Sequence, residues 1–149
     1  MNLQALPEEA LKEILALTEA KNRLDLQERA YDHFMPFAHH VYENFIEGAH
    51  HRIIAEKLEA VARGECKRLI INMPPRHSKS EFASYLMPAW FLGRNPKLKI
   101  IQATHNTELA VRFGRKVRDL IDDPAYKEIF PETNLKEDNK GAGKWGTDK

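Results

Sequence analysis

Apolar residues recur every three or four positions along much of the chain, a spacing that predicts amphipathic helices. The first helix is expected to begin at Pro7 and to end near Asn22. The segment 24–33 continues with mixed helical character, and Pro36 interrupts it. We interpret the first helix as one that packs locally, and a docking site for a partner is the alternative.

Two later segments show the same spacing. Residues 49–63 predict a helix that Gly64 terminates. Another helix is capped by Asn106 or Thr107 and runs to about residue 122. Three basic residues of this last helix share one face, which we interpret as solvated; contact with DNA phosphates or a neighbouring subunit is the alternative. These residues are Arg112, Arg115 and Lys116.

Two short apolar runs depart from the helical spacing. Leu69–Ile71 lies within a strand expected over 67–72, and Ile100 and Ile101 lie within one expected over 98–103. Unbroken apolar runs are typical of strands buried on both faces of a parallel sheet. The expected fold class is therefore α/β, an incomplete parallel sheet flanked by helices with an N-terminal helical segment.

The first of these strands leads into a short loop, Met73–Ser80, which opens a helical pattern over Glu81–Phe91 with Pro88 as a kink or end. The order of strand, loop, Lys-Ser and helix is how a P-loop nucleotide site is built. Its Walker A pattern is G-x-x-x-x-G-K-[ST], and here both glycines are replaced. The expected fold is thus P-loop NTPase-like. The alternative is that Lys-Ser after a strand is a coincidence common in α/β proteins.

The loop lacks glycine but retains donors for an anion. Pro75 and its neighbour Pro74 stiffen the loop without donating hydrogen bonds, so the phosphate cradle must come from the amides of about residues 76–80. Arg76 and His77 add side-chain donors, and an arginine can fork onto phosphate oxygens. Ser78 stands before the lysine, where a strongly positive φ would be strained for a serine.

Composition and charge narrow the class of protein. The chain has 149 residues, of which 42% are hydrophobic and 30% charged, as in ordinary globular proteins. No secretion signal or membrane-spanning run is seen, and the single cysteine, Cys66, suits a reducing cytoplasm. Residues 1–50 hold 9 acidic and 4 basic residues, whereas residues 51–149 hold 13 acidic and 19 basic ones. This basic excess favours anionic ligands, and adjacent histidines at 39–40 and 50–51 do not favour a metal site.

Around the loop, the chain resembles the large terminase subunits of tailed bacteriophages. The resemblance covers roughly residues 45–149, and its segments stand in family order. They are His50–Glu59, Leu69–Glu81, Phe91–Pro96, Ile100–His105, Phe113–Val117 and Lys144–Thr147. The domains expected from it are an N-terminal helical segment over 1–48 and a partial ATPase domain over 49–149, with 132–149 loose.

The resemblance implies the ATP-binding part of the motor that packages double-stranded DNA into the procapsid. It implies ATP and Mg²⁺ as cofactors, a portal protein and a small terminase subunit as partners, and a pentamer on the portal. It places the protein in the host cytoplasm, transiently at the procapsid portal, without a membrane. A separate C-terminal nuclease is also implied.

The same resemblance assigns roles to the loop. Lys79 is the phosphate-binding lysine and, with Arg76, a catalytic residue; Arg76 and His77 sense or stabilise the γ-phosphate, and Ser80 is the Mg²⁺ ligand. The region around His50 and His51 resembles the part that approaches the adenine. The nucleotide-binding residues are Pro75, Arg76, His77, Ser78, Lys79, Ser80 and Glu81.

Two departures from the family change what is expected of the chain. Ser78 stands where many members have glycine. The family's next strand ends in an acidic pair, the Walker B element, which is not found here, since Asp122 and Asp123 precede Pro124 as a cap and turn. Without that pair, the coupling motif or the nuclease, we expect negligible ATP hydrolysis by this chain. The alternatives are a truncated terminase-like binding or regulatory module without ATPase activity, and an unrelated helicase-like or kinase-like P-loop protein.

Overall fold

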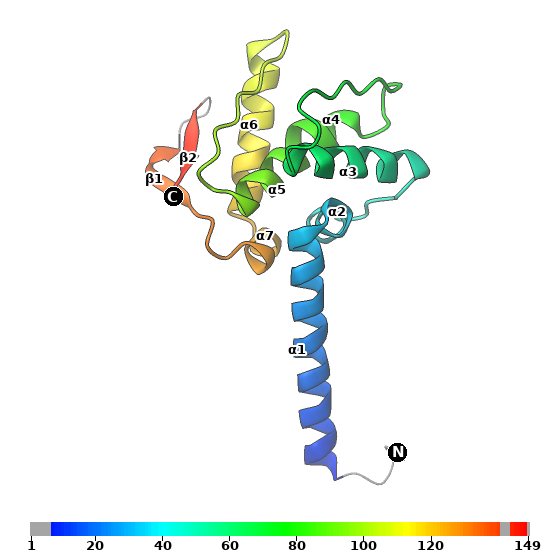
Figure 1. Ribbon diagram of the computed structural model, residues 1–149. Coiled ribbons are helices and arrows are strands. Elements are labelled where there is room, and N and C mark those ends of the chain that lie inside the picture. Colours follow the sequence, from blue (N-terminus) through cyan, green and yellow to red (C-terminus); the bar gives the residue numbers. More distant parts are fainter. Residues whose placement is uncertain (1–6, 141–143, 149) are drawn as a thin grey trace.

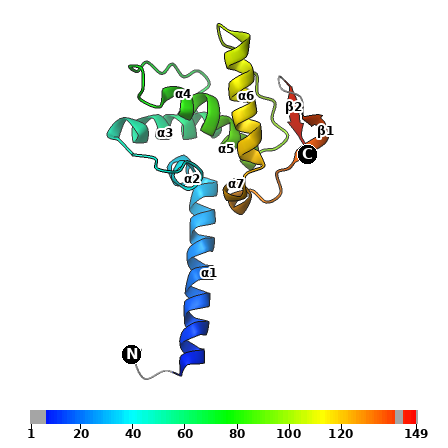
Figure 2. The same cartoon turned by 180° about the vertical axis from the view of Figure 1, so that it is seen from behind.

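The computed structural model describes residues 7–140 and 144–148, and most of them form helices. The long α1 (Glu8–Asp32) projects from a body built by the remaining elements (Figure 1). Seen from behind, α3 and α6 run through different parts of this body, with α5 between them (Figure 2). The body contains α2 (Phe34–Val41), α3 (Ala49–Ala62), α4 (Lys79–Glu81), the π-helix η2 (Phe82–Leu86), α5 (Met87–Arg94), α6 (Thr107–Ile121) and α7 (Pro124–Ile129).

The prediction of a parallel sheet is wrong. Within the described residues, the sheet consists of two antiparallel strands, β1 (Leu135–Lys140) and β2 (Trp145–Thr147). Both lie in the segment 132–149 that the sequence predicted to be loose. The class is therefore a mainly helical fold with one small antiparallel sheet, and not an α/β fold of the P-loop NTPase type.

The two segments expected as strands, 67–72 and 98–103, carry no strand pairing. An extended backbone becomes a strand only when a second strand satisfies its N–H and C=O groups. Among the described residues, no backbone hydrogen bond joins these two segments to each other. Nor are their apolar side chains all buried, because Ile70 is 86% exposed and Ile101 is 95% exposed. The two predicted strands are therefore wrong, because apolar composition does not specify whether a partner strand is present.

The predicted helices over 49–63 and 107–122 are confirmed as α3 and α6. Asn106 caps α6, since its side-chain oxygen accepts a hydrogen bond from the backbone N–H of Glu108 at 2.7 Å. The strongly one-sided apolar pattern of α6 buries Phe113, Val117 and Leu120 against the body. These elements formed as expected because their caps and periodicity are local signals.

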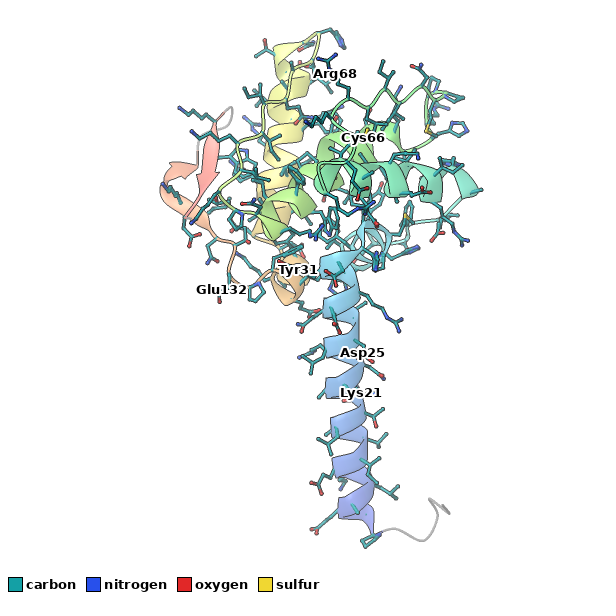
Figure 3. All side chains as sticks on the ribbon, in the orientation of Figure 1. Lys21, Asp25, Tyr31, Cys66, Arg68 and Glu132 are labelled. Carbon is teal, nitrogen blue, oxygen red and sulfur yellow. The ribbon has the colours of Figure 1, made fainter. Side chains whose placement is uncertain are left out.

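The helix α1 continues without a break to Asp32, past the expected end near Asn22. Of its side chains only Ala30 is buried, so local packing is limited to its last turn. Figure 3 shows Lys21 and Asp25 on the part that stands clear of the body. Helix α1 ends at Asp32, and α2 begins after His33. Pro36 lies in the first turn of α2, where a backbone N–H would have no partner within the helix, so the proline costs no hydrogen bond.

Pro88 produces a π-turn instead of a helix end. The helical path runs from Lys79 to Arg94, with η2 immediately before the proline. Because Pro88 has no N–H, it cannot donate to the carbonyl of Ser84, four residues earlier. The side-chain amide of Gln102 donates to that carbonyl instead, at 3.2 Å. The widened turn therefore also holds the extended segment 98–103 against η2.

The core gathers where α2, α5 and α7 meet. Trp90 is fully buried and its indole N–H donates to the Ala30 carbonyl at 3.0 Å, which fastens the end of α1 to α5. The ring of Phe34 packs edge-on against Trp90, with centroids 5.6 Å apart. The buried Tyr126 donates its hydroxyl to the Ala89 carbonyl at 2.9 Å, and its burial raises the pKa of that hydroxyl. This core supports the helical path that begins at Lys79.

Candidate functional site

The loop 73–78 leaves the extended segment 67–72 and turns into the helical path at Lys79. The extended segment lies over α3, and a hollow of about 250 Å³ separates the two. His50 and Ile54 of α3 line this hollow together with Leu69, Ile71 and Met73. Thus α3 lies next to the segment that leads into the loop.

Two residues of the loop have left-handed backbone conformations. Arg76 has a φ of 66° and Ser78 a φ of 57°. Ser78 stands at the second glycine position of the Walker A pattern, and it adopts the kind of conformation that favours glycine. Its carbonyl accepts the N–H of Phe82 at 2.9 Å, so the helical path begins directly after it. Strain of this kind concentrates at functional sites.

Some side chains of the loop contact its own backbone, and others are exposed to solvent. Lys79 reaches back so that its Nζ lies 3.5 Å from the Met73 carbonyl, across the mouth of the loop. The Nδ1 of His77 lies 2.9 Å from the Pro75 carbonyl, which can accept its proton. Arg76 and Ser80 are exposed. Among the described residues Arg76 forms no ion pair, so its guanidinium is available to an anion.

Glu81 does not join the loop residues. Its carboxylate forms an ion pair with the Lys116 ammonium at 2.7 Å, and that ammonium also lies 4.6 Å from the centre of the Tyr85 ring. The pair joins the start of the helical path to α6. It also removes Lys116 from the basic face expected on α6, because that charge is neutralised within the body. The contact joins residues 35 positions apart, so the local sequence carried no signal of it.

Three histidines gather beside the loop. The Nε2 atoms of His50 and His51 are 3.1 Å apart, and the rings of His50 and His77 have centroids 5.6 Å apart. His51 is buried and stacks on Phe82 at 4.9 Å. Its Nδ1 accepts the backbone N–H of Gly48 at 2.9 Å, which closes the N-terminus of α3. The sequence singled out the pair 50–51, but only the fold places these three histidines beside the loop.

We expect acid to destabilise the fold through His51. Burial, and then repulsion from His50, lower the pKa of His51 below its ordinary 6.5. At pH above 6.5 neither state binds the proton and the full stabilisation is present. As the pH falls below 6.5 the unfolded chain binds it first, so stability declines until the pH passes the lower folded-state pKa. Urea midpoints at pH 7.5 and 5.5 measure this loss.

The matched control for this prediction is His105, an exposed histidine far along the sequence. His51→Gln should reduce the difference between the two midpoints, whereas His105→Gln should leave it unchanged. An equal pH dependence in wild type and His51→Gln would contradict the assignment.

The acidic pair Asp122 and Asp123 lies between α6 and α7. Asp123 caps α7, because its Oδ1 accepts the N–H of Ala125 at 2.8 Å, which confirms the cap predicted for this acidic pair. Within residues 7–140 and 144–148, no group of three or more His, Cys, Asp or Glu side chains is arranged to hold a metal ion.

No protein-family model, curated protein or solved structure matches this chain. In the part of the chain that the structure describes, none of the helices has the length and apolar character needed to cross a membrane.

Proposed function

We propose that the loop 73–80 binds the triphosphate of ATP, and that the chain is the ATP-binding part of a terminase-like DNA-packaging motor. In this proposal the partners are double-stranded DNA, a portal protein and a small terminase subunit, with a pentamer as the working assembly. The proposal rests on the loop and on the family-like order of segments around it. It does not rest on a parallel sheet.

The main support for the proposal is the left-handed backbone conformation of Ser78. A serine with a φ of 57° stands directly before Lys79, where the Walker A pattern has glycine. A left-handed residue at a helix start turns successive amides towards one side, which is the arrangement that cradles phosphate oxygens. The strain at Ser78 thus has a physical explanation in anion binding.

The residues present fit a nucleotide phosphate in part. Lys79 and Arg76 would supply positive charge, and the amides of 76–80 would supply hydrogen bonds. Ser80 is exposed and would offer its hydroxyl to Mg²⁺, which when bound neutralises charge on the phosphates. Glu81 does not fit as a nucleotide ligand, since Lys116 holds its carboxylate. His77 would act through the backbone, since its ring is turned to Pro75.

A second candidate function is binding without turnover, in a terminase-like regulatory module. The engagement of Glu81, the acidic residue that directly follows the loop in sequence, favours it, because its carboxylate is paired with Lys116. A carboxylate that positions Mg²⁺ and water must be free to do so. Phosphate release from ATP by the purified chain separates the two functions, and Lys79-dependent turnover would favour the motor enzyme.

Lys79→Ala tests phosphate binding directly. A ligand at a hundred times its Kd stabilises a protein by about 2.7 kcal/mol, so Mg-ATP should raise the wild-type Tm by several degrees. Loss of the ammonium removes a charge-assisted contact worth about 1.5–3 kcal/mol, a roughly 10- to 100-fold weaker affinity. We therefore expect Lys79→Ala to lose from about half to most of the shift in Tm at the same ATP concentration.

Lys21→Ala is the matched control, because Lys21 lies on the projecting part of α1 (Figure 3). It removes the same charge and should keep the full shift. Inorganic tripolyphosphate should compete with ATP, since the loop is proposed to contact the phosphates. An absent shift in wild type, or an equal shift in wild type and Lys79→Ala, would disprove nucleotide binding by this loop.

A further inference from the structure

A cavity of about 720 Å³ is lined by residues on both sides of α6 in the sequence, and none of the residues of the phosphate loop line it. It is a partly open pocket lined by four parts of the chain: α5, the segment 96–102, which begins with a turn at Pro96 and Lys97, α6, and the strand β2 with the residue before it. In Figure 1 this extended segment runs alongside α6 and β2 lies nearby. The volume falls within the range of small-molecule sites, about 300–1,000 Å³.

The walls of this cavity are mainly apolar. α6 contributes small side chains, including Ala110 and Val111, and β2 contributes Trp145, which is half-buried. Two polar wall residues are already used by the fold. Gln102 donates to the Ser84 carbonyl and Thr147 donates to the Pro96 carbonyl at 2.7 Å. Apart from groups such as the hydroxyl of Thr107, the side-chain hydrogen-bonding capacity left to a ligand therefore lies in the charged residues of the wall.

Among the described residues that line the wall, the charged ones are all lysines: Lys97, Lys99 and Lys144. Among the residues that the structure describes, none of the three forms an ion pair with a carboxylate. Three positive charges around an apolar chamber attract a negative charge and repel a positive one. An apolar body would gain from burial against Val111 and Trp145.

We propose that this cavity binds a monoanionic amphiphile, an organic anion with an aromatic or alkyl body and one acidic head group. The body lies between α6 and the extended segment, and the head group faces the lysines. This site is separate from the phosphate loop, and it stands whether or not the loop binds ATP.

Two dyes with the same aromatic body test the charge requirement. The full chain is titrated with 8-anilinonaphthalene-1-sulfonate, an anion, and with N-phenyl-1-naphthylamine, which is neutral. We expect saturable binding of the sulfonate with one dye per chain, and competition by dodecanoate. Combined Lys97→Gln, Lys99→Gln and Lys144→Gln should weaken the sulfonate about tenfold, as three exposed charges of roughly 0.5 kcal/mol each imply, and leave the neutral dye unchanged.

A second set of variants separates this cavity from other apolar surface. Lys12→Gln, Lys21→Gln and Lys57→Gln together remove the same charge outside the cavity and should leave sulfonate affinity unchanged. Val111→Trp fills the cavity and should reduce binding of both dyes at least tenfold; Ala110→Leu on the same wall serves if Val111→Trp does not melt cooperatively.

Several results would overturn the proposal. They are non-saturable binding, equal weakening by the two lysine triples, and unchanged sulfonate affinity in a cooperatively folded cavity-filling variant. Both lysine triples alter exposed side chains, so these variants should stay folded. Comparing their sulfonate affinities therefore tests the proposal even if both cavity-filling variants unfold.

Discussion

Trp90→Ala is expected to lower the free energy of unfolding by about 3–5 kcal/mol, the usual cost of truncating a buried tryptophan. The indole is fully buried, Phe34 packs edge-on against it and the Arg94 guanidinium lies 4.8 Å from its ring centre. Truncation also leaves the Ala30 carbonyl without its donor. Because domains have only about 5–15 kcal/mol of stability, this loss would unfold a substantial part of the population on mild heating.

Urea unfolding monitored by circular dichroism measures the loss of unfolding free energy in Trp90→Ala. Two further variants show where that loss comes from. Trp90→Phe keeps most of the ring volume but removes the N–H, so it should cost about 1–3 kcal/mol. Trp145→Ala is the matched control, since it deletes the same side chain from a half-buried position and should cost less than Trp90→Ala. Equal losses at positions 90 and 145 would contradict the assignment of Trp90 to the centre of the core.

Gly93→Ala is expected to destabilise the protein by about 1–3 kcal/mol, although alanine is the better helix former. A Cβ at position 93 would lie 2.5 Å from the Cγ and Cδ2 atoms of Phe130. Phe130 is buried and packed against Tyr126 and Phe37, so its ring has little room to move. The overpacking should therefore exceed the roughly 1 kcal/mol gained from helix propensity.

The same urea measurement tests Gly93→Ala, with Gly114→Ala as the matched control. Gly114 lies within α6 and lines the large cavity, where a methyl group can be accommodated. That variant should be neutral or stabilising. Adding Phe130→Leu to Gly93→Ala should recover part of the loss, since a smaller side chain relieves the contact. A Gly93→Ala protein as stable as wild type would show that Phe130 moves freely.

The candidate loop could be located from the sequence because its signals are short-range. Lys79 follows an apolar run and a proline-stiffened turn, and Ser78 occupies the glycine position of the pattern. The structure adds the φ angles of Arg76 and Ser78 and shows Glu81 turned away to Lys116. The family resemblance suggested Glu81 for the site, but a partner on α6 decided where its carboxylate lies.

The sequence by itself determined the helices α3 and α6, the cap at Asn106 and the break ahead of Pro36, because caps, apolar spacing and proline act within a few residues. It also predicted strands over 67–72 and 98–103, and that prediction was wrong. Only the tertiary structure decided that these segments remain unpaired, that the sheet forms instead between β1 and β2, and that His50, His51 and His77 meet beside the loop. Pairing joins distant residues, and composition does not specify which neighbour a segment meets.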